Sequence, residues 1–462
     1  MYSNRLQSYG RVPRPPAVTA SPELPLGDFV ETVARSSLDE SHQAGRVGIS
    51  DTKLIASYNW VADSRPKIMV PGKPPKWTPP TQPAKLKWDA GTYYRDVNAA
   101  SYPDHPMEPA VVSIMKMNPE PIPVNIVACG NTIGNLLRFS RGPEEDKPFR
   151  MLVEVIGDTV HFIRREKSPK EVIPDVKGFG HTFPEAYTTW DGETRRSVSH
   201  QRILAYRFGG LDMMVRFEGD GFIQSPSMQR KEPTASSSTG NDNALPDLSA
   251  LGMTMPVPVP STGEPKLEVV DGGQLIPQDA VFDLKTRSMR ARDVDTLGSQ
   301  LHRLWVSQIE QFILAYHERG IFNDIQVNRV DGKVKEWEEL NQPTLKRLAA
   351  LLHLIVDRAR GAADGKLEIV CSRGDELEIR RQGPGAGDVL SASVRAEWAE
   401  WLGDATSPAS SLKGKKWDCP ELRYDVDDEG YHDTFSDFSD SDGLKDLTAC
   451  DRECGYCGYC SY

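Results

Sequence analysis

Apolar and polar residues alternate in several short runs of the chain, the pattern of strands that bury one face. The runs at 149–156 and 159–165 flank Gly157 and Asp158, a two-residue turn signal, so we expect a β-hairpin there. Further strands are expected at 124–128, 201–208, 211–218, 266–270 and 281–288, with a pair at 367–371 and 377–381 and a second hairpin of 325–330 with 333–336.

Other segments place apolar residues at helical spacing. The longest is 294–318, which ends before Gly320 and carries a broad apolar stripe: Leu297, Leu301, Leu304, Trp305, Ile309, Phe312, Ile313 and Tyr316. Helices are also expected at 27–37, from about residue 110, and at 131–139, 343–360 and 391–402. This mixture predicts an α/β fold with a central twisted mixed sheet flanked by helices on both sides.

Composition divides the chain into ordered and disordered parts. Hydrophobic residues make up 38% of the sequence, which contains 37 glycines and 35 prolines, as is typical of an ordered domain with disordered segments. We expect a disordered segment at 1–50, an ordered domain at 51–405 with a disordered insertion at 224–263, an acidic disordered tail at 406–446 and a cysteine-rich tail at 447–462.

Charge and hydropathy narrow the function classes. The net charge of −11 argues against a protein that coats nucleic acid with its whole surface, although it allows a local basic groove. The sequence has no apolar run of about 18 residues and no apolar signal core at its start, so we expect no membrane span and a location in the nucleus or cytoplasm. The acidic tail could bind a protein partner.

Two strands, which we expect to be adjacent or near-adjacent in the sheet once the insertion at 224–263 is left aside, end in charged side chains that could act together. Asp283 and Lys285 alternate onto one face of 281–288, and Glu218 and Asp220 share a face at the end of 211–218. Carboxylates held close together repel, and a bound Mg²⁺ or Mn²⁺ would relieve that cost while Lys285 stabilises phosphate charge. A salt bridge from Lys285 to a carboxylate, with no metal, explains the same residues.

The order of these motifs resembles the PD-(D/E)XK nuclease superfamily and, more closely, the eukaryotic RNA decapping exonuclease family. The motifs are Gly180-His-Thr-Phe183, Glu218-Gly-Asp220, Asp283-Leu-Lys285 and Leu304-Trp-Val-Ser-Gln308, within a likeness that spans roughly residues 55–380. The resemblance implies a nuclease-like fold, an RNA 5′ end as substrate, and Mg²⁺ or Mn²⁺ as cofactor. It implies a catalytic Lys285, metal ligands Asp220 and Asp283 with Glu218 beside them, and site contacts from Gln308 on the helix and from Gln311 one turn further on. Arg164 or Arg165, at the end of a strand, could contact phosphate. The alternatives are plain surface arginines and a Gln308 that only caps a solvent face.

One position departs from the family pattern. The family has a glutamate directly after the aromatic residue, whereas Pro184 follows Phe183 here and Glu185 comes one residue later. A shift of one residue on a strand turns a side chain to the other face, so Glu185 would serve catalysis only if a bulge restored its direction.

The segments 57–60, 70–77, 177–181, 186–189 and 283–288 also resemble a fungal group often labelled geranylgeranyl pyrophosphate synthetase. Prenyl synthases need paired aspartate-rich motifs on helices. The nearest such pair, Asp427-Asp428, lies in the acidic tail, and the many alternating strands do not fit a helical synthase.

Four cysteines close the chain at short spacing: Cys450, Cys454, Cys457 and Cys460. Four thiolates in this arrangement could hold one Zn²⁺, and the two intervening glycines would permit the turns. Reactive thiols, lipid-modified thiols or no function are the alternatives.

The sequence therefore leaves two main functions open. One is a metal-dependent nucleic-acid hydrolase acting on RNA 5′ ends, by decapping, pyrophosphohydrolase or exonuclease-like chemistry. The other is a catalytically degenerate protein of the same fold that acts as a binding or scaffold module, for which Pro184 and the acidic tail speak.

Overall fold

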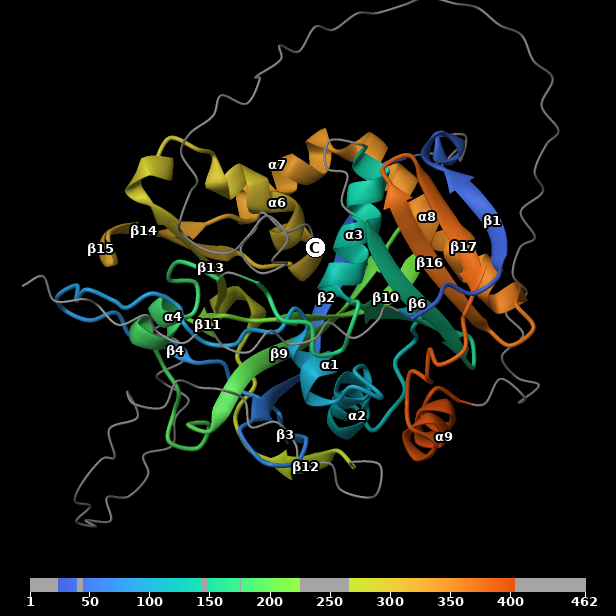
Figure 1. The fold of residues 1–462 in the computed structure, drawn as a ribbon, viewed down its shortest axis with the longest axis horizontal. Coiled ribbons are helices and arrows are strands. Elements are labelled where there is room, and N and C mark those ends of the chain that lie inside the picture. Colours follow the sequence, from blue (N-terminus) through green and yellow to red (C-terminus); the bar gives the residue numbers. More distant parts are fainter. Residues whose placement is uncertain (1–23, 40–44, 143–147, 175, 225–265, 404–462) are drawn as a thin grey trace, which may run out of the picture.

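The computed structural model describes residues 24–39, 45–142, 148–174, 176–224 and 266–403. These residues form a mixed α/β fold with two sheets and helices around them, as expected from the sequence (Figure 1). The expected insertion at 224–263 and both tails, including the four terminal cysteines, lie almost entirely outside the described residues, so the predictions made for them stay predictions.

The larger sheet has eleven strands within the described residues and combines parallel with antiparallel pairs. In order across the sheet they are β1 (Phe29–Ala34), β17 (Glu376–Arg381), β16 (Lys366–Arg373), β6 (Phe149–Ile156), β7 (Thr159–Arg165), β5 (Ile126–Cys129), β10 (Leu211–Glu218), β9 (Ser197–Phe208), β2 (Ile49–Val61), β3 (Lys67–Val70) and β12 (Glu268–Asp271).

The smaller sheet has six strands within the same residues. In order they are β15 (Ile321–Arg329), β14 (Gln311–Glu318), β13 (Val281–Ser288), β11 (Gly221–Phe222), β4 (Lys76–Trp77) and β8 (Thr188–Thr189). The central pair, β13 and β14, runs parallel, and β13 is buried along nearly its whole length.

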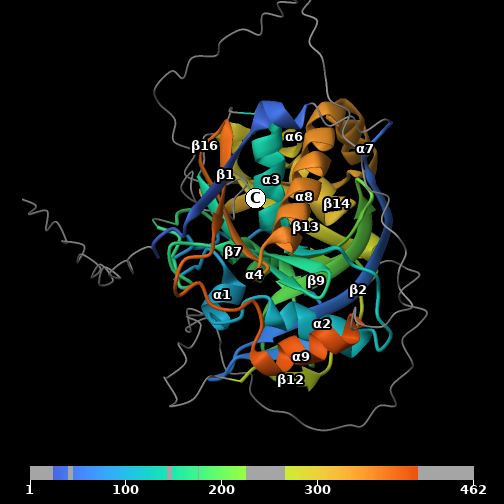
Figure 2. The ribbon, with the colours of Figure 1, turned by 90° about the vertical axis from the view of Figure 1, so that its right-hand side faces the viewer.

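Helices cover both faces of the larger sheet (Figures 1 and 2). The larger sheet is covered by α2 (Glu108–Met117) and α9 (Ala392–Trp401) on one face and by α3 (Gly130–Arg141), α6 (Thr296–Ser307) and α8 (Gln342–Gly361) on the other, whereas α4 (Thr182–Tyr187) packs on the smaller sheet. The other helices of the described residues are α1 (Val97–Ser101) and α7 (Asp331–Leu340), with short 3₁₀ turns η1 (Arg35–Leu38), η3 (Gln278–Ala280) and η4 (Met289–Ala291).

The strands of the larger sheet sort their side chains between two cores with a period of two. Ile126 and Ala128 of β5 enter the core under α3, α6 and α8, whereas Val127 between them enters the core under α2 and α9. Because both faces are covered, these strands are apolar on both sides. This arrangement confirms the predicted sheet with helices on both sides, and it excludes the nearly all-helical architecture of a prenyl synthase.

Several elements are confirmed almost residue for residue. The hairpin of β6 and β7 pairs across Gly157 and Asp158, and β10 and β13 have the expected bounds. The helices expected at 343–360 and 391–402 are α8 and α9, and β16 pairs with β17.

The helix expected at 27–37 is wrong, and so is the expectation of disorder through residue 50 where the structure describes the chain. Residues 29–34 form β1, which pairs antiparallel with β17 near the other end of the chain. The local sequence is ambiguous, and the pairing with a distant strand decides its conformation.

The single helix expected at 294–318 is also wrong. The helix α6 ends at Ser307, and Gln308 follows in the left-handed conformation with a φ of 49°. Beyond it, Phe312, Ile313 and Tyr316 lie on β14, which is buried on both faces. A strand that is apolar on both faces has no alternation, so its residues extend the helical stripe of α6.

The hairpin expected around Asp331 and Gly332 is wrong as well. The strand β15 pairs with β14 across the turn at Arg319 and Gly320, and Asp331 begins the helix α7. The Asp-Gly pair thus lies where a strand gives way to a helix, a boundary at which turn residues are equally common.

Candidate functional site

The candidate site lies where the chain passes from one sheet to the other. The strand β10 of the larger sheet ends at Glu218, and after Gly219 and Asp220 the chain enters β11 of the smaller sheet. The pairing of β11 with β13 then brings Asp220 to β13, where its Oδ2 accepts a hydrogen bond of 2.7 Å from the Leu284 N–H.

Gly221 allows this close approach of the two strands. A Cβ at this position would lie 2.4 Å from the ring of Phe282 and 2.9 Å from the carbonyl oxygen of Pro75. The expected convergence of the two carboxylate-bearing strands is therefore present. It runs through β11 and not through direct pairing of β10 with β13.

The converging side chains open into a cavity of about 280 Å³. Among the charged residues singled out in the sequence, those that line it are Arg164, Glu185, Glu218, Asp220, Asp283 and Lys285. Lys285 is 5% exposed and Asp283 is 5% exposed, so both charges lie in a largely water-excluded wall. The structure thus brings the acidic and basic motifs of four separate segments to one place.

Burial and mutual repulsion disfavour the charged forms of two of these carboxyl groups. Burial, followed by the charge of Asp283, raises the pKa of Asp220 to about 7. Burial, followed by the charge of Asp220, raises the pKa of Glu218 to about 8. A cation placed between Asp220 and Asp283 would favour both carboxylates.

Arg303 is a cavity residue that the sequence did not reveal. It projects from α6 and forms a salt bridge with Asp283, and the two side chains are only 14% and 7% exposed. No sequence motif marks Arg303, because an arginine is an ordinary residue on the polar side of an amphipathic helix. The salt bridge between α6 and β13 is what places it at the site.

Further cations surround the carboxylates. Within the described residues, the lining contains five carboxyl groups and six cationic side chains. The cations are Arg95, Arg164, Arg216, Lys285, Arg287 and Arg303. Arg216 is held by a hydrogen bond of 3.0 Å from its Nη1 to the carbonyl oxygen of Pro106, and Arg164 pairs with Glu166 at 2.5 Å. A wall of this kind is suited to phosphate oxygens.

Glu185 lines the cavity from a helix and not from a strand, contrary to the expectation. It lies on α4, where its N–H donates to the carbonyl oxygen of His181 at 3.2 Å. Burial, followed by the charge of Asp89, raises the pKa of Glu185. Asp89, which is not part of the Asp220–Asp283 pair, is thus the charged neighbour that affects Glu185. Because Glu185 lies on a helix, no strand bulge is needed to direct its side chain.

The remaining predicted contacts lie away from the cavity. Arg165, next to Arg164 on β7, points to the other face of the sheet. Gln308 does not face the site from a helix, because it caps α6 and its Nε2 donates to the Trp305 carbonyl oxygen at 2.6 Å. Gln311 begins β14 and donates to the carbonyl oxygen of Asp279 at 2.6 Å.

The donor set of the site fits one divalent cation held by two carboxylates. Asp220 and Asp283 supply hard oxygen donors, and Mg²⁺ in proteins is commonly bound by one or two carboxylates together with water and substrate phosphates. In the part of the chain that the structure describes, no three His, Cys, Asp or Glu side chains gather into a metal-binding group. Glu218 therefore lies beside the carboxylate pair without completing such a group.

No helix among the described residues has the length and apolarity that crossing a membrane requires.

Solved structures of Rai1 and Dxo1 proteins, members of the RNA decapping exonuclease family that the motifs resemble, are similar to this chain. Scheffersomyces stipitis Rai1 in complex with (3′-NADP)⁺ and calcium ion is 10% identical in sequence, with a TM-score of 0.49, and the match covers 82% of this chain and 99% of that chain. Candida albicans Rai1 in complex with pU5-Mn²⁺ is 9% identical, with a TM-score of 0.45, and the match covers 82% of this chain and 99% of that chain. K. lactis Dxo1 in complex with manganese is 9% identical, with a TM-score of 0.42, and the match covers 79% of this chain and 98% of that chain.

A comparison with curated protein sequences finds no match. A family model described as "Domain of unknown function (DUF8563)" matches residues 33–379, which include all strands and helices that build the cavity. Since this match covers most of the chain, the protein belongs to the DUF8563 family.

Proposed function

We propose that this protein is a divalent-metal-dependent hydrolase that cleaves phosphodiester or pyrophosphate bonds at RNA 5′ ends. The observation that carries the proposal is the convergence of Asp220, Asp283 and Lys285 on one cavity whose lining also carries five arginines. The 5′ end of an RNA presents several phosphate oxygens together, and arginine forks bind such groups with two hydrogen bonds each. The motif order of the sequence supports the choice of RNA.

The roles of the side chains follow from their places. Asp220 and Asp283 would hold one Mg²⁺ or Mn²⁺, which when bound activates water and stabilises charge on the scissile phosphate. Lys285 would donate from Nζ to a phosphate oxygen and so stabilise the charge that develops there. Arg164 and Arg216 would bind flanking phosphates and keep the substrate in register with Lys285.

A second candidate is a binding protein without catalysis. The salt bridge of Arg303 with Asp283 favours it, because the guanidinium already neutralises one of the two metal-binding carboxylates. The absence of a three-ligand group among the described residues points the same way. In this case the cavity would bind a phosphorylated end and leave it intact.

Metal binding and hydrolysis separate the two candidates. We would titrate the full-length protein with Mn²⁺ by calorimetry, and follow hydrolysis of a 5′-triphosphorylated RNA with Mg²⁺ or Mn²⁺. The variants are Asp220→Asn and Asp283→Asn, and the matched control is Asp271→Asn, an exposed aspartate on β12.

The hydrolase predicts Mn²⁺ binding and cleavage in the wild type and in the control, with both lost in the two site variants. A wild type that binds the triphosphorylated RNA but neither binds Mn²⁺ nor cleaves would establish the binding protein instead. Cleavage that persists in both site variants would place the chemistry elsewhere.

A further inference from the structure

An exposed tryptophan stands among basic side chains beside the cavity. Trp88 is 54% exposed, and Lys85 and Lys87 of the same segment are exposed as well. The exposed indole offers solvent a large flat apolar face, on which a nucleic-acid base can stack. We call the set formed by Trp88, Lys85, Lys87, Lys177 and Arg319 the Trp88 surface.

Backbone hydrogen bonds hold the members of the Trp88 surface together. The N–H of Leu86 donates to the carbonyl oxygen of Gly320 at 2.9 Å, so Lys85 and Lys87 lie beside the turn that contains Arg319. The N–H of Asp89 donates to the carbonyl oxygen of Gly178 at 2.8 Å, which brings the Lys177 segment next to Trp88.

The Trp88 surface has a net positive charge. Its four cationic side chains are all exposed, and within the described residues none of them pairs with a carboxylate. Glu318 on the same turn is exposed and offsets one of these charges. The combination of an exposed aromatic ring with unpaired cations is the arrangement that binds single-stranded nucleic acid, through stacking on bases and attraction of phosphates.

The chain leads from this surface directly into the cavity. The carboxylate of Asp89, next to Trp88, accepts hydrogen bonds from the N–H groups of His181 at 3.1 Å and Thr182 at 2.8 Å, at the start of α4. Tyr93 stacks on His181 with ring centroids 3.4 Å apart. His181 lines the cavity, and so does Tyr94, the residue after Tyr93. Tyr94 lies six positions after Trp88 in the sequence, so the surface and the cavity wall are at most about 22 Å apart along the chain.

We propose that the Trp88 surface binds the single-stranded part of a nucleic acid whose 5′ end lies in the cavity. Trp88 stacks on a base, and Lys85, Lys87, Lys177 and Arg319 contact phosphates. The inference rests on the proposed function for the place of the 5′ end, but the surface itself needs neither metal nor catalysis. Stacking and phosphate contacts do not read the 2′-hydroxyl, so RNA and DNA should bind there alike.

The test measures binding without chemistry. Full-length protein in EDTA is titrated against a fluorescent 5′-hydroxyl oligouridylate of about ten nucleotides, followed by anisotropy. Trp88→Ala should weaken binding roughly 5- to 150-fold, and Trp88→Phe should keep most of the affinity because it keeps an aromatic face. The matched control is Phe29→Ala, which removes a ring that is 55% exposed on β1, far along the sheet from the cavity strands.

Two further arms test the place and the charge of the surface. A 5′-phosphorylated diuridylate, which is too short to leave the cavity, should bind wild type and Trp88→Ala equally. The double variant Lys85→Gln/Lys87→Gln should lower the slope of log affinity against log salt by roughly 0.7 for each phosphate that the protein no longer neutralises. The same oligomer made of DNA should show the same dependence on Trp88.

The inference is overturned if Trp88→Ala binds the longer oligonucleotide as tightly as wild type, if Phe29→Ala weakens binding equally, or if wild type does not bind it at all. The experiments can refute the Trp88 surface and the proposed hydrolase independently of each other. Loss of affinity in Trp88→Ala together with no cleavage of any RNA supports the surface and refutes only the hydrolase. Cleavage that depends on Asp283 together with an unaffected Trp88→Ala does the reverse.

Discussion

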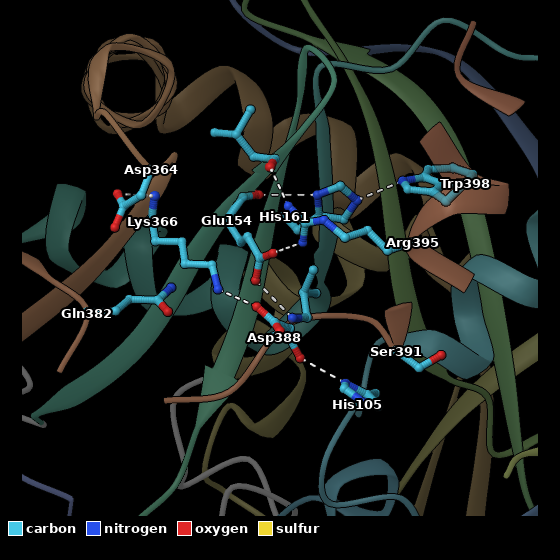
Figure 3. A network of polar contacts seen from close by, with 12 residues as sticks. His105, Glu154, His161, Asp364, Lys366, Gln382, Asp388, Ser391, Arg395 and Trp398 are labelled. Carbon is cyan, nitrogen blue, oxygen red and sulfur yellow. Dashed lines mark hydrogen bonds and ion pairs between the residues drawn. The ribbon is translucent and has the colours of Figure 1, made fainter. Parts of the chain in front are cut away.

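Mild acid should destabilise this protein through His161, a buried residue of β7. Figure 3 shows its ring between Glu154 on the neighbouring strand and Trp398 of α9. The Nε1–H of Trp398 donates to Nε2 at 3.0 Å, so that nitrogen has to be unprotonated, and Nδ1 lies 3.2 Å from the Glu154 carbonyl oxygen as its donor. Burial, opposed by that hydrogen bond and assisted by the charge of Arg395, lowers the pKa of His161 to about 4.

The size of the effect follows from the two pKa values. In the unfolded chain His161 titrates near its ordinary value of 6.5, so between 6.5 and about 4 the unfolded state binds more protons than the folded state. The contribution to stability is therefore complete above pH 6.5 and is lost as the pH falls. From pH 7 to pH 5 the loss from this one group is about 2 kcal/mol.

Urea unfolding at pH 7 and pH 5 measures this loss in the wild type and in His161→Gln. The amide oxygen of glutamine can still accept from Trp398 but does not titrate in this range. Other histidines, among them the half-buried His181 and His302, have pKa values lowered by burial and add to the total in both proteins. The difference between the two pH dependences should be about 2 kcal/mol, and an identical dependence would refute the assignment to His161.

Three other changes test the site and its support. Lys285→Met should lower hydrolysis about 100-fold or more while leaving Mn²⁺ binding in place, as kinetics and calorimetry on the same protein would show. Arg303→Gln should raise the affinity for Mn²⁺ roughly tenfold, because it frees Asp283 from a competing cation; calorimetry that shows weaker binding would contradict this competition. Gly320→Ala should lower the free energy of unfolding, measured in urea, by about 1–3 kcal/mol, because the residue has a φ of +89° and a Cβ would lie 2.8 Å from the backbone oxygen of Leu86. The matched control Gly332→Ala in α7, with open space around it, should cause no loss of stability.

Sequence reasoning succeeded where the signal was local. The hairpin of β6 and β7 is encoded by two alternating runs and the turn at Gly157 and Asp158, all within 17 neighbouring residues. The carboxylates and the lysine of the candidate site were found in the same way. Charged side chains at the ends of apolar strands are costly to bury, so their presence within an apolar run is a signal that can be recognised in the sequence.

The failures come from contacts between distant segments. The apolar residues of β14 follow α6 after a short turn at Gln308, and no local pattern shows that they pair with β13 instead of continuing the helix. Arg303 is ordinary on the amphipathic surface of a helix until α6 packs over Asp283. In both cases the tertiary arrangement decides, which a single sequence does not display.

The passage from β10 into β11 makes the site a joint product of both halves of the chain. Residues up to 224 supply Asp220, and residues from 266 onward supply Asp283, Lys285 and Arg303. Neither half can assemble the carboxylate pair by itself, so the pair forms only after β11 has docked on β13. If the proposed site binds Mn²⁺, fragments made by cleaving the backbone between the two halves should regain that binding only when they reassociate, so metal binding would report completed assembly of the protein.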